Sequence, residues 1–81
     1  MQHFRSTHFR RALEKLAPKI QKAFEKQLRF LLSDIRHPSL RAKKYDEAAG
    51  IWQARVNDNI RFYFSIVDDM YLMLEIEKHK D

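Results

Sequence analysis

The strongest constraint on the fold is a strict alternation of apolar and polar side chains in the second half of the chain. In Ile60–Ile66 every second residue is apolar, and Arg61 and Tyr63 lie between them. Ile51–Val56 alternates in the same way, with Arg55 on its polar side. A period of two is typical of antiparallel strands that are buried on one face only. The sequence therefore predicts a sheet with an apolar face and a polar, partly open face.

The turn between these two strands brings two arginines face to face. If residues 57–59 form the turn, Arg55 lies directly opposite Arg61. Like charges in a cross-strand pair destabilise a hairpin by roughly 0.2–1 kcal/mol. A sheet that keeps such a pair is expected to hold something anionic on its polar face.

A third strand is predicted at about 70–77, and two registers compete for its pairing with 60–66. A two-residue turn at 68–69 would pair Ile66 with Tyr71 and Phe64 with Met73. Matching the apolar faces requires a longer or bulged turn instead. The pairs of this second register are Phe62 with Ile76, Phe64 with Leu74 and Ile66 with Leu72. We favour the second register, because a slip of one residue would turn every side chain to the wrong face.

The favoured register also fixes the polar face. It pairs Arg61 with Glu77, Tyr63 with Glu75 and His79 with Asn59. The predicted open face then carries Arg55, Arg61, Tyr63 and His79. The opposite face is expected to form the core, with Trp52, Phe62, Phe64, Leu72, Leu74 and Ile76, while the methionines at 70 and 73 fill gaps.

The first half of the chain predicts a short strand and two helices. Met1–Arg5 is consistent with a strand, and Thr7 is the expected cap of a first amphipathic helix. Pro18 fits the first position of a second helix that runs to about Ser33, because its missing N–H is not needed there. Residues 34–50 hold the only glycine and are expected to be mostly loop. We predict a single α+β domain over 1–81, with a helical hairpin packed on a small antiparallel sheet in the order β-α-α-β-β-β.

The composition narrows the class of partner. The net charge is +5 and the isoelectric point is near 9.7, which favours polyanions or an acidic protein. There is no cysteine, as suits a reducing cytoplasm. No apolar run approaches the ~20 residues of a membrane span, and no signal-peptide pattern opens the chain. The four histidines lack the spacing of a helical zinc site, so no metal and no other cofactor are expected.

With these elements in place, the sequence resembles the RelE/ParE toxins of type II toxin–antitoxin systems. The resemblance covers the order of elements over the whole chain and is sharpest from His37 to Phe64. The motifs that carry it are HPSLRAKK at 37–44, GIWQARV at 50–56, NIRFYF at 59–64 and the basic pair Lys78-His79.

The resemblance implies a bacterial or archaeal cytoplasmic toxin that an acidic antitoxin neutralises. RelE-like members enter the ribosomal A site and cut mRNA without a metal, by attack of the ribose 2′-OH on the adjacent phosphate. ParE-like members inhibit DNA gyrase and cut no RNA. The nuclease is the favoured branch. The alternatives are a ParE-like gyrase inhibitor and an inactive member that only binds antitoxin.

The resemblance also assigns roles to individual residues. Arg61 and Arg55 match basic positions that stabilise the phosphate during cleavage, and an arginine suits this role through its fixed, bidentate donors. His79 matches a histidine used for proton transfer in YoeB- and YafQ-type toxins, and its ordinary pKa suits that role. The candidate RNA contacts are Lys43, Lys44, Tyr63 and Lys78.

Two departures from RelE bear on these roles. Gln53 stands where RelE has a lysine, and the sequence ends two residues after His79, before the tail that supplies a tyrosine in RelE. His79 is then the one obvious titrating group of the predicted site. A simpler interpretation competes with each role: a structural ion pair with Glu77 for Arg61, and solvation alone for the basic loop and the chain end.

Overall fold

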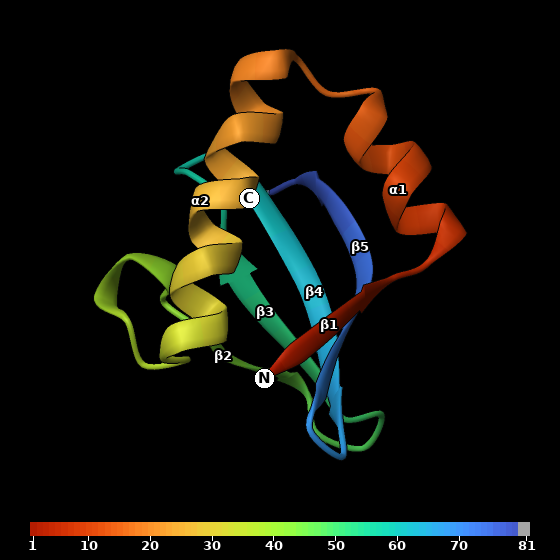
Figure 1. Cartoon of the computed structure of the whole chain (residues 1–81), viewed down its shortest axis with the longest axis vertical. Helices are drawn as coiled ribbons and strands as arrows, with labels where there is room; N and C mark the ends of the chain where they lie inside the picture. Colours follow the sequence, from red (N-terminus) through yellow and green to blue (C-terminus); the bar gives the residue numbers. More distant parts are fainter. Residues whose placement is uncertain (80–81) are drawn as a thin grey trace.

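The computed structural model describes residues 1–79, which form a curved sheet of five strands with both helices packed against it (Figure 1). The strand order is β1-β5-β4-β3-β2. The elements are β1 (Gln2–Arg5), α1 (Thr7–Glu14), α2 (Pro18–Ser33), a short 3-10 helix (Pro38–Leu40), β2 (Lys43–Asp46), β3 (Ile51–Arg55), β4 (Ile60–Val67) and β5 (Met70–Lys78). The predicted two-layer α+β fold is confirmed.

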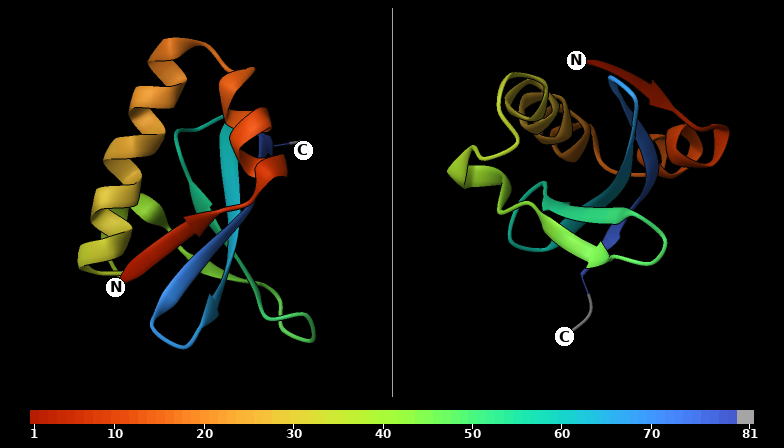
Figure 2. Two further views of the ribbon diagram at one scale, coloured as in Figure 1. Left: turned by 45° about the vertical axis from the view of Figure 1, so that its right-hand side comes forward. Right: turned by 90° about the horizontal axis from the view of Figure 1, so that it is seen from below.

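The sheet differs from the prediction at both edges. β1 runs parallel to β5 and lies alongside it, although the two are far apart in the sequence (Figure 2). The sheet is therefore mixed and not purely antiparallel. The segment predicted as loop contains the short 3-10 helix and β2, which pairs antiparallel with β3. β2 escaped prediction because all four of its residues are exposed, so they show no apolar alternation.

Local signals explain where the helices begin. Pro18 is the first residue of α2, and the helix ends at Ser33, as predicted. The cap of α1 is Ser6 and not Thr7: the Ser6 side chain accepts a hydrogen bond of 3.0 Å from the Phe9 backbone N–H. Both residues are good caps, and the strand that ends at Arg5 places Ser6 in the extended conformation that a cap requires.

The two competing registers of the last hairpin are both present, each at one end. Near the turn, Phe64 faces Met73 and Ile66 faces Tyr71, as a two-residue turn requires. Beyond a shift between Tyr63 and Phe64, the pairing follows the favoured register. Its pairs there are Phe62 with Ile76, Tyr63 with Glu75 and Arg61 with Glu77. The favoured register is therefore confirmed for the far half of the hairpin and wrong for the half beside the turn.

The bulge changes which side chains of β5 reach the core. Met73 and Tyr71 are buried, whereas Leu72 and Leu74, predicted as core, are only partly buried. On β4, Ile66 is 40% exposed. The step from one inward residue of β5 to the next is three residues at the bulge, so a uniform period of two selects the wrong set.

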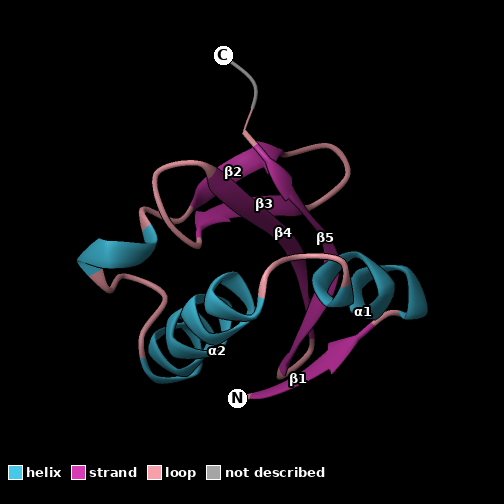
Figure 3. Cartoon of the chain, turned by 90° about the horizontal axis from the view of Figure 1, so that it is seen from above, coloured by secondary structure: helices cyan, strands magenta, loops and turns pink. Residues whose placement is uncertain are grey.

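The hydrophobic core lies between the helices and strands β3–β5 (Figure 3). Phe9 of α1 contacts Phe24 of α2, and Phe24 contacts Phe62 of β4, each pair with ring centroids 5.2 Å apart. Trp52, predicted as core, is partly buried and packs at the edge of this cluster. The helices thus cover the apolar face of the sheet and leave the polar face for the site.

Among residues 1–79, no helix is both long and apolar enough to cross a membrane.

Candidate functional site

A pocket of about 270 Å³ lies on the polar face of the sheet, at the end where β4 begins and β5 ends. Its side chains come from β3, from β4, from the residue that follows β5, from the first residue of β2 and from the segment just before β2. Five of its six lining residues are basic. The six are Arg41, Lys43, Gln53, Arg55, Arg61 and His79. The three predicted catalytic residues, Arg55, Arg61 and His79, therefore share one pocket.

Arg61 is the most firmly held of these side chains. It is 6% exposed, and its Nη1 donates hydrogen bonds to the backbone carbonyls of Asn57, at 2.8 Å, and of Asp58, at 3.1 Å. A third, longer bond of 3.3 Å runs to the Ile60 carbonyl. Carbonyl oxygens satisfy the buried guanidinium without cancelling its charge. Arg61 therefore presents a positive charge in a fixed direction.

This geometry does not match the simple ion pair expected as the alternative for Arg61. The Cα positions of Arg61 and Glu77 are partners across β4 and β5, as predicted. Among residues 1–79, however, no salt bridge joins their side chains, and the Arg61 bonds run to the β3–β4 turn instead. The positive charge of Arg61 is thus not neutralised by the strand beside it.

Arg55 lies opposite Arg61 across β3 and β4, as predicted. Its side chain is 31% exposed and is 3.7 Å from a carboxylate oxygen of Asp58, which is almost fully exposed. An ion pair with so exposed a partner contributes little and is easily exchanged for another anion. Arg55 is therefore the more adaptable of the two facing arginines.

Gln53 and Tyr63 form a buried polar pair at the floor of the polar face. They are 7% and 8% exposed, and Gln53 Nε2 donates a hydrogen bond of 3.1 Å to the Tyr63 hydroxyl. The Tyr63 ring also lies edge-on to Tyr45, with centroids 5.0 Å apart. Because Tyr63 is buried and does not line the pocket, it is poorly placed to stack on a base. Of the two tyrosine rings, the exposed one is that of Tyr45.

The two predicted loop lysines separate onto different faces. Lys43 pairs with Gln53 and lines the basic pocket, whereas Lys44 pairs with Trp52 and has its Nζ 5.9 Å from the Trp52 ring. Neighbouring residues of a strand point to opposite faces, so only one of the two can join the site. Lys44 lines a separate hollow of about 180 Å³ beside Trp52.

The end of β5 brings His79 to the pocket and leaves Lys78 outside the residues that line it. The backbone N–H of His79 donates a hydrogen bond of 2.7 Å to the Asn59 carbonyl, so His79 lies opposite Asn59, as predicted. Lys78 pairs with Ile60 and is exposed. The main-chain bond holds His79 beside the β3–β4 turn, on the side of the sheet where the arginines lie.

Sequence reasoning missed Arg41 as a site residue. Arg41 follows the 3-10 helix and adopts a left-handed backbone conformation, with φ of 45°. This conformation costs a non-glycine residue about 1–2 kcal/mol, and no sequence pattern predicts it here. The available signal was the position of Arg41 two residues before Lys43, close to the lysines already expected to contact RNA.

The pocket offers chemistry suited to a phosphate group. Four permanently charged side chains and an imidazole surround a space large enough for one phosphodiester. Guanidinium groups donate paired hydrogen bonds to phosphate oxygens, and imidazole is a group that often donates or accepts protons in catalysis. Among residues 1–79, no group of three histidine and carboxylate side chains is placed to hold a metal ion.

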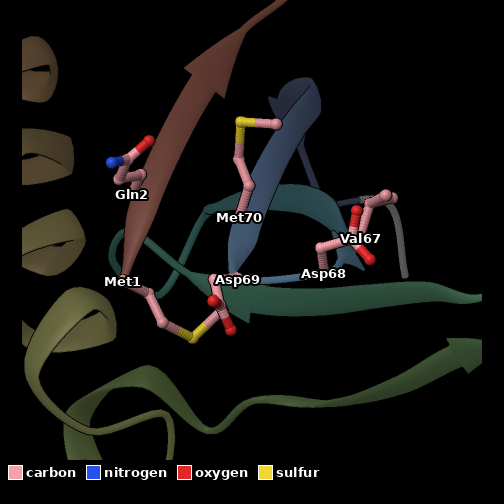
Figure 4. A pocket seen from close by; sticks show the side chains of 6 residues that line it. All are labelled: Met1, Gln2, Val67, Asp68, Asp69 and Met70. Carbon is pink, nitrogen blue, oxygen red and sulfur yellow. The ribbon is translucent and has the colours of Figure 1, made fainter.

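A larger hollow of about 650 Å³ lies at the opposite end of β4 (Figure 4). Its lining comes from the start of β1 and the β4–β5 turn, and includes Met1, Val67 and Met70 together with Asp68 and Asp69. Two carboxylates and no basic side chain make it unsuited to an anionic ligand. The smaller basic pocket remains the candidate site.

Comparisons with known proteins identify the fold. No protein-family model matches the sequence, and no curated protein matches it by sequence. The YoeB/ParE toxin from Agrobacterium tumefaciens superposes with a TM-score of 0.80 at 12% identity, over 99% of this chain and 100% of that chain. The chain has the RelE/ParE toxin fold.

Two further neighbours support the RelE/ParE fold. The toxin–antitoxin complex RelBE2 from Mycobacterium tuberculosis gives a TM-score of 0.73 at 25% identity, over 96% of both chains. The YoeB dimer from Staphylococcus aureus gives 0.81 at 13% identity, over 99% of this chain and 98% of that chain. The resemblance predicted from HPSLRAKK and the later motifs is therefore confirmed at the level of fold.

Proposed function

We propose that this chain is the toxin of a type II toxin–antitoxin system and cuts mRNA in the cytoplasm, on the ribosome and without a metal. The observation that carries the proposal is the convergence of Arg55, Arg61 and His79 in one basic pocket. The neighbours with the same fold are described as toxins, several in complex with antitoxins. An acidic antitoxin suits the +5 charge of this chain.

In the proposed reaction the 2′-oxygen of a ribose forms a bond to the adjacent phosphorus, and the bond from phosphorus to the 5′-oxygen breaks. One group takes the proton of the 2′-OH and another protonates the leaving 5′-oxygen. The products are a 2′,3′-cyclic phosphate and a 5′-hydroxyl. We assign Arg61 and Arg55 to the charge that develops on the phosphate and His79 to one of the two proton transfers.

In this proposal the ribosome positions the mRNA, because the pocket is too small to do so alone. A space of about 270 Å³ holds a phosphodiester but not a codon. Positioning of the 2′-OH in line with the leaving oxygen must then come from the decoding site, and such alignment is a major part of the rate. Lys43 and the exposed Lys78 and Tyr45 are available for contacts to the RNA backbone or bases.

The test is cleavage of ribosome-bound mRNA by purified protein. We expect Arg61→Lys and His79→Ala each to reduce the cleavage rate by about 10²-fold or more and to relieve growth arrest on expression. Lysine keeps the charge of Arg61 but loses its forked donors. Arg29→Ala and His8→Ala change exposed residues of the same types on the helices, and should cleave like the parent.

The outcomes separate the competing functions. Full toxicity and cleavage in both site variants would contradict the assignment. Intact mRNA together with a loss of DNA supercoiling would identify a ParE-like gyrase inhibitor. A folded parent protein that arrests neither process but still binds an antitoxin would be an inactive member.

A further inference from the structure

Gln27 is a buried amide in α2 that does not line the basic pocket but contacts two segments that do. It is 5% exposed among the apolar residues of the helix. Its Nε2 donates hydrogen bonds to the backbone carbonyl of Arg55, at 2.8 Å, and to that of Ser39, at 3.1 Å. Its Oε1 accepts a bond of 3.2 Å from the Ser39 hydroxyl. Since both carbonyls can only accept, the orientation of the amide is fixed.

The two carbonyls belong to two different segments of the chain that carry lining residues of the pocket. We call the segment with Arg41 and Lys43 the Arg41 wall, and the hairpin with Arg55 and Arg61 the Arg55 wall. Arg55 is at the end of β3, and Ser39 lies in the 3-10 helix that leads directly to Arg41. The ladder between β2 and β3 pairs Lys43 with Gln53, and two more residues in the same register would pair Arg41 with Arg55. The ladder ends at Lys43, so β2 and β3 do not join these two positions as strand partners.

Electrostatic repulsion acts against the closeness of these walls. Arg41 and Lys43 stand on one wall, and Arg55 and Arg61 on the other. Like charges that line one pocket repel one another, and the repulsion is stronger where water is partly excluded. Without a bound anion, other contacts must hold the two walls together against this repulsion. The β2–β3 ladder does so at Lys43 and Gln53, and the Gln27 amide does so beyond the end of the ladder.

We propose that Gln27 is a positioning residue that sets the distance between the Arg41 wall and the Arg55 wall, and thereby the affinity of the pocket for a phosphate group. This inference rests on the proposed function, because it assumes that the pocket binds phosphate. Gln27 itself touches neither the phosphate nor the pocket. Its effect passes through the Arg55 and Ser39 carbonyls.

The test is a titration of the isolated protein with inorganic phosphate, in which NMR signals of the arginine side chains report binding. Gln27→Met keeps the size of the side chain but leaves both carbonyls without a donor. We expect the dissociation constant for phosphate to rise about fivefold. Gln21→Met is the matched control: Gln21 also lies in α2 and donates to two carbonyls, those of Glu14 and Leu16, in a segment that contributes no lining residue to the pocket.

A cycle with Arg41→Ala distinguishes positioning from general loss of stability. If Gln27 positions the Arg41 wall, Arg41→Ala should weaken phosphate binding less in the Gln27→Met protein than in the parent. With Gln21→Met the two effects should simply add. Ser39→Ala removes one of the three bonds, and serves as a milder variant if Gln27→Met unfolds.

The results separate the inference from the proposed function. A parent protein that does not bind phosphate would contradict the phosphate pocket itself. If the parent binds phosphate and both the Gln27→Met and the Ser39→Ala protein bind it with the same affinity as the parent, the positioning role is overturned. Equal weakening by Gln27→Met and Gln21→Met would also overturn it, because the effect would then be global.

Discussion

At the scale of single residues, the basic pocket depends on side chains that backbone carbonyls hold in place. Carbonyls of the β3–β4 turn fix the Arg61 guanidinium, and the Gln27 amide in turn fixes the carbonyl of Arg55. A neutral acceptor orients a cation without quenching its charge, whereas a carboxylate would compete with the ligand. Charge and rigidity are thus provided by different chemical groups.

The separation of Arg41 from Lys44 makes a prediction at this scale. Arg41→Ala should lower the rate of RNA cleavage about tenfold, because one charge-assisted contact to the phosphate is lost. Lys44→Ala removes a positive charge three residues away but on the other face, and should change the rate less than about twofold. Cleavage of ribosome-bound mRNA measures both. Equal losses would mean that overall charge matters more than pocket geometry.

The residues of the site differ in how far sequence alone could place them. Arg55 and Arg61 could be placed opposite each other because two clear strands flank a short turn. The burial of Arg61 could not be predicted, since it depends on where the turn carbonyls point. Arg41 was missed because β2 lay in the segment predicted as loop.

At the scale of elements, the β4–β5 hairpin combines a tight turn with a bulge. Asp68 in the turn has a φ of 53°, the left-handed region, while Asp69 does not lie in that region. The tight turn sets one register and the bulge restores the other, so each of the two competing predictions describes half of the hairpin. A uniform alternation rule cannot place a bulge, because a single extra residue leaves no pattern of its own.

The conformation of the turn predicts that glycine substitutions at its two aspartates have opposite effects on stability. Asp68→Gly should raise the free energy of unfolding by about 0.5–1 kcal/mol, because glycine adopts positive φ without strain. Asp69→Gly should lower it by a similar amount, since there glycine only adds freedom to the unfolded chain. Urea unfolding measures both changes. The two variants remove the same charge, so a shift of the same sign in both would contradict this account of the turn.

At the scale of the whole molecule, the order and type of most elements followed from the sequence, whereas the edges of the sheet did not. Hydrophobic periodicity marked β3 to β5 and both helices, because each buries a distinct face. β1 and β2 are four residues long and expose much of their surface, so their pairing depends on the assembled sheet. The parallel pairing of β1 with β5 joins opposite ends of the chain and has no local signature.

The stability of the whole molecule should depend on pH through His3 of β1. Burial, and then the nearby Arg5, lower the pKa of His3 from its ordinary value of 6.5, more than Glu25 raises it. As the pH falls through 6.5, the unfolded chain therefore takes up more protons at this position than the folded one, and stability declines until the folded pKa is passed.

Urea unfolding of the parent and of His3→Gln at about pH 7.5 and pH 5.5 measures this contribution. The parent should lose more stability between the two pH values than the variant does. An identical loss in both proteins would show that His3 is not responsible.

The clasp of Arg61 on the β3–β4 turn has a consequence for how activity is lost by mutation. The same guanidinium that faces the pocket also ties down the loop between two strands. Replacing Arg61 should loosen the hairpin and also remove a positive charge that the pocket needs for cleavage. Such variants would therefore also be degraded faster in the cell. Replacing the Arg41 side chain breaks none of the hydrogen bonds that hold this turn. We expect spontaneous survivors of toxin expression that still accumulate full-length protein to carry changes at Arg41 more often than at Arg61.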